Sequence, residues 1–254
     1  MSFRERTLKT PALVLRRQEY GEADYLLTVF TPEHGKLTAI AKGARRTLSR
    51  KMGQVELYSL TELVISRGRN LHIIAQADMR DAFSPLREDL TRNMLAAHCV
   101  ELLDAFAVAE EGNPAAFNLL KAALGWLCEP DGDLYLAVRY FEYRLLRTMG
   151  FEPSVMQCAI SGEPLTAQDH YFCAAEGGVI LPEYTAGQDV MLLPLPILKI
   201  LRYFSREKWP KVRTLRLQAE HHTTLERVLG AYIVYLLERP PKSLKMLSRL
   251  QEDT

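Results

Sequence analysis

The chain has 254 residues, of which 48% are hydrophobic and 25% are charged, and its formal net charge is +1. This length suits one large domain or two small ones with a sizeable core. No apolar run reaches the roughly 18–20 residues that a membrane span needs, so we expect no membrane association.

The charge is unevenly distributed along the chain. Residues 1–80 carry a net +6, residues 81–200 carry −10 and residues 201–254 carry +5. We expect the two basic ends to meet an anionic partner, and mutual attraction between the ends and the acidic middle is the alternative. Residues 1–6 lack the apolar core of a secretion signal, and the four cysteines are scattered. Reduced thiols in a cytoplasmic protein are therefore expected.

Residues 11–77 have the composition of short β-strands separated by turn signals. The predicted strands are Pro11–Arg17, Asp24–Thr31, Gly35–Gly43, Val55–Ser66 and Asn70–Ala77. Five strands in so short a stretch favour a closed barrel, because closure removes exposed edges. We predict an OB-fold barrel over residues 1–80, and a small SH3-like barrel is the alternative.

After Ser84-Pro85 the hydrophobic period becomes helical, which predicts a helical domain over residues 81–254. Capping and breaking residues delimit its helices: Asn113-Pro114 starts the second, and Asp131-Gly132-Asp133 caps the third. Helices are expected at 86–108, 114–128, 134–149 and 196–206, and a last one holds the apolar residues from Leu225 to Leu236 and is stopped by Pro240-Pro241. Residues 152–193 lose the period and are expected to form an irregular insert. The predicted fold class is all-β plus all-α, in more than one domain.

Within Thr28–Lys51, a predicted pair of strands is followed by a loop rich in arginine and lysine. A hairpin that presents a basic loop can hold a phosphate backbone without reading its sequence, whereas a solvated loop is the alternative. The predicted DNA contacts are Arg16, Arg17, Lys36, Lys42, Arg45, Arg46, Arg50 and Lys51. Candidates for base stacking are Tyr20, Tyr25, Phe30 and Tyr58, with core packing favoured for Phe30.

Two further groups of cations stand out. A second basic patch surrounds Tyr203, Phe204 and Trp209 and consists of Arg202, Arg206, Lys208, Lys211 and Arg213. The helix at 134–149 mixes arginine with tyrosine, which would suit a pocket for an acidic peptide. Its residues are Arg139, Tyr140, Tyr143, Arg144 and Arg147. Ion pairing with neighbouring carboxylates explains these arginines about as well. His221-His222 is read as a surface or capping pair, because adjacent helical residues point about 100° apart.

The order of these parts resembles the RecO family of bacterial recombinational repair proteins. The resemblance rests on residues 12–15, 21–24, 27–31, 35–37 and 39–46, and on Leu146–Pro153 ahead of the insert. It implies an OB-fold, a helical domain and a small zinc-finger-like insert. It further implies a non-enzymatic protein that is cytoplasmic and nucleoid-associated in bacteria. Such a protein binds single- and double-stranded DNA, anneals complementary strands and helps load recombinase onto strands coated by single-stranded-DNA-binding protein.

The resemblance also implies two protein partners, RecR and the C-terminal tail of the single-stranded-DNA-binding protein. Many members carry two Cys-x-x-Cys pairs in the insert, and this chain departs from that pattern. The aligned positions hold Cys158, Ser161, Leu181 and Tyr184, so Cys158 is a lone remnant of the metal ligands. Cys173, His170 and Asp169 lie nearby in the sequence and are the possible substitute ligands. Structural zinc, however, prefers a complete set of nitrogen and sulfur ligands. We therefore expect no cofactor, and an insert packed by Leu181 and Tyr184.

An enzyme and a protein adaptor are the alternatives to this function. The chain has no Walker-type phosphate loop, no Gly-x-Ser-x-Gly elbow and no His-Glu-x-x-His, so an enzyme is not expected. A protein adaptor that uses the barrel as an interaction surface, without binding DNA, is the remaining alternative. Salt separates the two, because binding to DNA phosphates weakens steeply with ionic strength.

Overall fold

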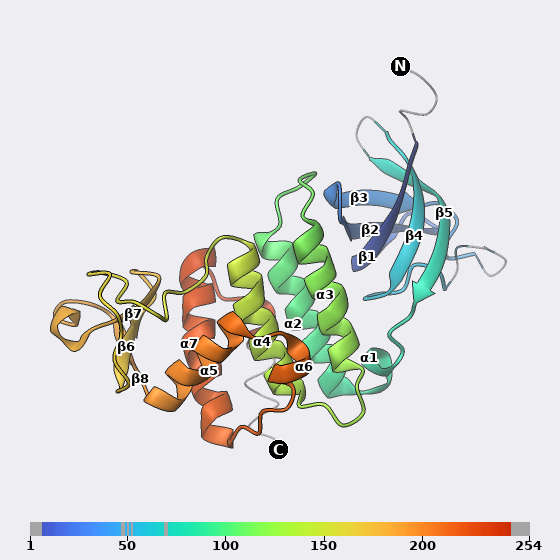
Figure 1. Ribbon diagram of the computed structural model, residues 1–254. Helices are drawn as coiled ribbons and strands as arrows, with labels where there is room; N and C mark the ends of the chain where they lie inside the picture. Colours follow the sequence, from blue (N-terminus) through green and yellow to red (C-terminus); the bar gives the residue numbers. More distant parts are fainter. Residues whose placement is uncertain (1–6, 47–48, 50, 52, 69–70, 245–254) are drawn as a thin grey trace. The chain divides into compact units, whose positions relative to one another are not determined.

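The computed structural model describes residues 7–46, 49, 51, 53–68 and 71–244 (Figure 1). The chain divides into two compact units, Met1–Cys128 and Glu129–Thr254, here called the N-terminal unit and the C-terminal unit. The last barrel strand ends at Asp81, and the two long helices that follow group with the barrel. Within the described ranges, no helix is both long and apolar enough to cross a membrane.

A closed five-stranded barrel opens the N-terminal unit, as predicted (Figure 1). Its strands are β1 (Thr7–Tyr20), β2 (Asp24–Thr31), β3 (Gly35–Ala41), β4 (Leu60–Ser66) and β5 (His72–Asp81). The long strand β1 pairs antiparallel with both β2 and β4, and β3 closes the barrel by pairing in parallel with β5. Inward-facing apolar side chains such as Val14, Leu27 and Leu63 are fully buried and form the barrel core.

Several strand boundaries differ from the sequence prediction: β1 also begins earlier, at Thr7, β3 ends earlier, at Ala41, and β5 continues to Asp81. The expected strand Val55–Ser66 begins only at Leu60, because residues 53–59 form turns held by polar contacts. Strand β1 extends to Tyr20, well beyond the expected end at Arg17, because its last residues pair with the start of β2. The sequence Arg67-Gly68-Arg69-Asn70 is also typical of a hairpin turn, and its last two residues lie outside the described residues.

Three helices complete the N-terminal unit: α1 (Pro85–Glu88), α2 (Leu90–Phe106) and α3 (Pro114–Leu127). The side chains of Asp89 and Asn113 accept hydrogen bonds from the backbone at Arg92 and Ala116, and so cap α2 and α3. The loop between these helices lies against the β2–β3 turn. A Cβ on Gly35 would stand 2.0 Å from the carbonyl oxygen of Glu111, so the barrel and the helices interlock through their backbones.

The C-terminal unit is built on α4 (Leu134–Thr148), α5 (Leu195–Arg206) and α7 (Ala219–Leu237), with a short α6 (Trp209–Val212) that the sequence did not predict. Asp133 caps α4 as expected, accepting from the backbone N–H of Leu136 at 2.9 Å. Tyr140, Phe204 and Trp209 pack ring against ring in the interior of this unit. The helices therefore share one aromatic core.

The insert contains a three-stranded sheet, in the order β7-β6-β8. Its strands are β6 (His170–Cys173), β7 (Gly178–Ile180) and β8 (Val190–Leu193). A single 3-10 turn at Pro182–Tyr184 lies between β7 and β8. Strands of three or four residues are too short to show an alternating pattern, which is why the sequence indicated an irregular segment. Phe172, Val179 and Leu181 are buried and give the insert an apolar interior.

Candidate nucleic-acid interface

The β1–β2 hairpin and the loop after β3 are fastened together at one end of the barrel. The backbone N–H of Arg45 donates to the carbonyl of Ala23 at 2.9 Å. The carboxylate of Asp24 accepts from the N–H of Gly43 at 2.7 Å. Gly21 and Gly43 have φ angles of 58° and 67°, which let the chain turn tightly at both places. The start of the basic loop is therefore held against the hairpin.

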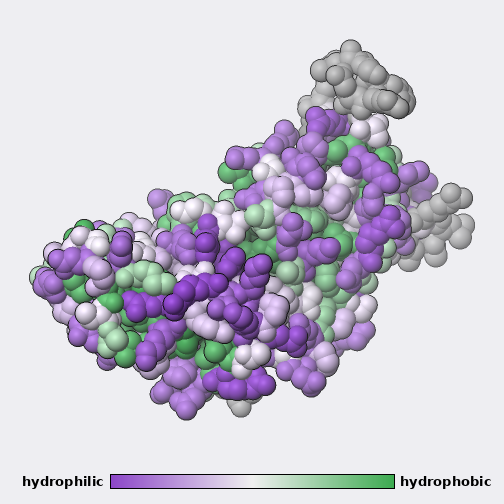
Figure 2. All heavy atoms as spheres, in the orientation of Figure 1, coloured by the Kyte–Doolittle hydropathy of each residue, from purple (hydrophilic) through white to green (hydrophobic). Residues whose placement is uncertain are grey.

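This arrangement brings four predicted residues to one place, which we name the tip site: Tyr20, Lys42, Arg45 and Arg46. Lys42 and Arg46 are exposed, and neither forms an ion pair with any other described residue. The Arg45 side chain is 29% exposed and lies 2.8 Å from Glu19. On the visible face of the molecule, hydrophilic residues cover much of the N-terminal unit (Figure 2). The tip site thus offers three cations and one aromatic ring.

Arg16 and Lys36 occupy a different setting. Both pair with Asp104 of α2, whose side chain is 8% exposed, and Lys36 also donates to the Asp104 carbonyl at 2.8 Å. These two cations join β1 and β3 to the helix. Sequence reasoning did not single out Asp104, and no local signal marks it, because the Arg16 contact spans 88 residues.

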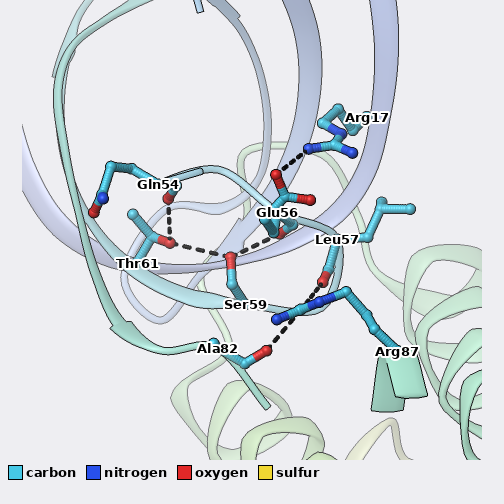
Figure 3. Close-up of polar contacts among 8 residues, drawn as sticks. All are labelled: Arg17, Gln54, Glu56, Leu57, Ser59, Thr61, Ala82 and Arg87. Atoms are coloured by element: carbon cyan, nitrogen blue, oxygen red, sulfur yellow. Dashed lines mark hydrogen bonds and ion pairs between the residues drawn. The ribbon is translucent and has the colours of Figure 1, made fainter. Parts of the chain in front are cut away.

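Arg17 points toward Glu56, with 2.7 Å between the charged atoms (Figure 3). Its guanidinium also lies 4.8 Å from the centre of the Tyr25 ring. Ser59 and Thr61 stabilise the turn that carries Glu56, and their hydroxyls bond to each other (Figure 3). The Ser59 hydroxyl donates to the carbonyl of Glu56, and the Thr61 hydroxyl donates to the carbonyl of Gln54. The Arg17 side chain is therefore held in place by Glu56 and by the Tyr25 ring of the neighbouring strand.

The remaining predicted loop cations are Lys51 and Arg50. The ammonium of Lys51 donates to the carbonyl of Ile74 at 2.6 Å, against β5. Burial lowers the pKa of Lys51, with Asp24 opposing and Lys42 adding to the shift. Arg50 lies outside the described residues.

The aromatic candidates separate by exposure. Phe30 is fully buried, as favoured, and Tyr58 is 8% exposed. Tyr25 is half-buried, with Arg17 over its ring. Tyr20 is 45% exposed and directly follows Glu19 on β1. Among the four candidates, Tyr20 is therefore the ring that a base could reach most easily.

The second basic patch is divided by the structure. Arg202 is half-buried, and its guanidinium donates to the carbonyls of Val155 and Leu165 at 2.8 and 3.1 Å, which pins the insert to α5. Burial lowers the pKa of Arg202, and Arg206 adds to that effect. The remaining four cations are exposed, two of them in ion pairs: Arg206, Lys208, Lys211 with Glu207, and Arg213 with Glu129.

The arginines and tyrosines of α4 do not form a pocket open to solvent. Arg139 is 1% exposed and lies 3.1 Å from Glu142, itself fully buried. Tyr140 and Tyr143 are buried as well, and burial raises the pKa of both phenols. The structure thus places the first part of the expected peptide pocket inside the unit. The more accessible members are Arg144, over the Tyr140 ring, and Arg147, which pairs with Glu152 at 3.4 Å.

The insert does not provide a zinc site. Cys158 is buried, and its sulfur accepts from the N–H of Ser161 at 3.5 Å. Burial alone would raise the pKa of this thiol, but the hydrogen bonds to its sulfur outweigh burial and lower it. Across the described residues, no three His, Cys, Asp or Glu side chains come close enough to hold a metal. One sulfur among Ser161, Leu181 and Tyr184 does not fit zinc.

The nearby polar residues have structural roles instead. Asp169 accepts from the backbone N–H of Leu195 at 2.8 Å and caps the start of α5. His170 is buried, with one ring nitrogen 3.0 Å from the carbonyl of Thr166. His221 accepts from the N–H of Gln218 in a capping box, and His222 lies 3.2 Å from Asp133. The capping role expected for this histidine pair is therefore seen at His221.

Two family models match the chain. The model described as "Recombination protein O N terminal" matches residues 1–83, and the one described as "Recombination protein O C terminal" matches residues 87–245. The first match covers the barrel and the second covers the helices together with the insert. The described elements thus fall within the two matches almost without remainder.

Curated relatives are similar along nearly the whole chain. A protein named "DNA repair protein RecO" from Roseiflexus sp. (strain RS-1) is 36% identical over 98% of this chain and 88% of its own length. Proteins of the same name from Alkaliphilus metalliredigens and Dehalococcoides mccartyi (strain CBDB1) are 34% and 32% identical. These matches cover 91% and 96% of this chain, and 94% and 96% of the relatives.

Proposed function

Because this chain belongs to the RecO family, we propose that it is a DNA-binding recombination mediator in gap and double-strand-break repair. It binds single- and double-stranded DNA, anneals complementary strands and helps load recombinase onto strands coated by single-stranded-DNA-binding protein. It carries out no catalytic chemistry. RecR and the C-terminal tail of the coating protein are its proposed protein partners.

The tip site is the observation that carries the DNA-binding part of this proposal. Lys42 and Arg46 are exposed cations, and Arg45 lies beside them on a loop held against the hairpin. Arginine can donate two parallel hydrogen bonds to a phosphate, whereas lysine acts as a point charge. Tyr20 adds a ring on which a base can stack. Such a surface binds nucleic acid through its backbone, without sequence preference.

Annealing follows from the same electrostatics. Two complementary strands repel each other through their phosphates, and cations that neutralise part of that charge let the bases meet. Because each neutralised phosphate releases counterions, the affinity for DNA should fall steeply as salt increases. An adaptor that used apolar contacts would show no such dependence.

The test is the binding of a fluorescent single-stranded oligonucleotide, measured by anisotropy across a salt series. We expect Lys42→Glu/Arg46→Glu to weaken binding by about tenfold or more at low salt. The matched control is Lys121→Glu/Lys199→Glu, which changes the net charge equally at exposed positions on α3 and α5. Annealing of complementary oligonucleotides should be impaired in the first variant and retained in the second.

The outcomes separate the alternatives. Equal losses in the two double variants would mean that net charge matters and the tip site does not. If the wild-type protein showed no salt-sensitive binding, the adaptor reading would replace the DNA-binding proposal. Retained binding in Lys42→Glu/Arg46→Glu, together with loss in Arg206→Glu/Lys208→Glu, would move the DNA site to the second basic patch.

A further inference from the structure

Arg45 at the tip site already faces an anionic group of its own chain. One terminal nitrogen of its guanidinium lies 2.8 Å from the carboxylate of Glu19. The other lies 3.4 Å from the carbonyls of Gly21 and Glu22, at the turn of the β1–β2 hairpin. The Glu19 side chain is 69% exposed, so this ion pair stands on the surface.

A carboxylate and a phosphate present similar acceptors to a guanidinium, because each offers two oxygens that match its planar donors. We propose that Glu19 is an internal competitor of the DNA backbone. Its carboxylate occupies the place on Arg45 that a phosphate takes when nucleic acid binds, and so it lowers the affinity of the tip site. This inference rests on the proposed DNA-binding function.

Two other carboxylates, Asp104 and Glu56, pair with predicted DNA contacts and are poorly suited to this role. Asp104 is nearly buried and holds Arg16 and Lys36 between the barrel and α2, so its departure would disturb the fold. Glu56 lies in a turn whose backbone is fastened by neighbouring hydroxyls (Figure 3). Glu19 is near the end of β1, and an exposed ion pair contributes little to stability. Glu19 can therefore turn away from Arg45 at little structural cost.

The competition also favours a polymer over a small anion. An isolated phosphate that displaced Glu19 would gain contact with Arg45 alone. A strand with successive phosphates can reach Lys42 and Arg46 at the same time, since both are exposed beside Arg45. Glu19 thus makes the tip site selective for a chain of phosphates.

The experiment compares Glu19→Gln with Glu22→Gln. Each substitution removes one negative charge from the same hairpin, but the Glu22 carboxylate forms no ion pair with the part of the chain that the structure describes. Binding of the fluorescent oligonucleotide is measured by anisotropy over several salt concentrations, in the full-length protein. Inorganic phosphate serves as a competing small anion.

We expect Glu19→Gln to bind the oligonucleotide about three- to tenfold more tightly at low salt, and Glu22→Gln to change affinity less than about twofold. The salt dependence should steepen in Glu19→Gln by up to roughly 0.7 in the slope of log K against log salt, the value of one phosphate on a single strand. Inorganic phosphate should compete better against DNA in this variant. The gain should vanish in Glu19→Gln/Arg45→Gln when it is compared with Arg45→Gln.

Each other outcome overturns the inference. Equal gains in Glu19→Gln and Glu22→Gln would show that Glu19 acts through net charge alone. Weaker binding in Glu19→Gln would show that Glu19 positions Arg45 for DNA and does not compete with it. If neither the wild type nor any variant bound DNA in a salt-sensitive way, the proposed function would fail first, and the inference with it.

Discussion

In the N-terminal unit, Lys42 and Arg46 stand exposed at the tip site, whereas in the C-terminal unit Arg139 and Arg202 turn inward onto oxygens of the protein itself. The sequence gives both groups the same appearance, as cations mixed with aromatic residues. What distinguishes them is the partner that each cation has in the folded chain. A basic cluster can therefore be a binding surface or an internal support of the fold. Mutation of a binding surface should weaken DNA binding, whereas mutation of an internal support should lower the stability of the protein.

The largest effect on stability should follow from removing the buried Arg139–Glu142 ion pair in the C-terminal unit. We expect Arg139→Met to lower the free energy of unfolding by about 3–5 kcal/mol, because the fully buried Glu142 loses the cation beside it. Urea unfolding followed by circular dichroism measures the change. The double variant Arg139→Met/Glu142→Leu should recover much of the loss. A loss below about 1 kcal/mol in the single variant would contradict an internal role.

The N-terminal unit should depend less on its cations than on a close backbone approach. We expect Gly35→Ala to cost about 2–4 kcal/mol, because Gly35 has a φ of 58° and its Cβ would clash with the loop between α2 and α3. Gly53→Ala is the matched control: its φ is 75° and, apart from its chain neighbours, no atom of the described residues lies within 4 Å of the added Cβ. It should cost about 1 kcal/mol. Equal costs would mean that the interlock adds nothing to stability.

A pair of neighbouring arginines sharpens the comparison within one helix. Arg202→Gln should lower the stability of the protein by about 2 kcal/mol, because two hydrogen bonds to carbonyls of the insert are lost. Arg206→Gln removes the same charge from an exposed position and should change stability by less than about 0.5 kcal/mol. Thermal unfolding measures both. Their effects on DNA binding should be alike; a much larger loss of DNA affinity in Arg202→Gln would mark it as a contact.

The smallest effect concerns the cap of α4. Burial raises the pKa of Asp133, but hydrogen bonds from His222 and from the backbone of Leu136 outweigh it, so that the net pKa is lowered. A carboxylate with a lowered folded pKa stabilises above its unfolded pKa, near 3.9, and the benefit disappears as the pH falls through the folded value.

We therefore expect Asp133→Ala to lose about 1 kcal/mol at neutral pH, and the difference from wild type to vanish at acid pH. Unfolding in urea at several pH values measures it. Asp131→Ala, an exposed neighbour, serves as the control. A difference that persisted undiminished at the lowest pH would show that the charge of Asp133 plays no part.

The contrast between the units also explains what the sequence could predict. Local signals were enough for the five strands, for the caps at Asn113 and Asp133, and for the burial of Phe30. Each depends on residues a few positions away. The family resemblance was also readable, because its residues fall in those same strands and turns.

The partners of the cations were not predictable, because they are distant in sequence. Asp104 lies 68 residues from Lys36, and the contact of Arg202 with Val155 spans 47 residues. The face on which Arg139 lies depends on how α4 packs against α7, which no local pattern reveals. Which predicted site residues remain exposed is therefore a property of the fold: Lys42 and Arg46 remain so at the tip site, as do four cations of the second basic patch.

The pairing of Arg16 and Lys36 with Asp104 has a consequence for experiments on isolated domains. A fragment cut at residue 80 would keep both cations and lose the carboxylate that neutralises them, together with the loop that packs on Gly35. In such a barrel, Arg16 and Lys36 would lack the ion pairs with Asp104 that they form in the whole chain. It would bind any polyanion more strongly than the intact protein does, so affinities and footprints measured on it would overstate the natural surface. A fragment that ends at Cys128 keeps this balance.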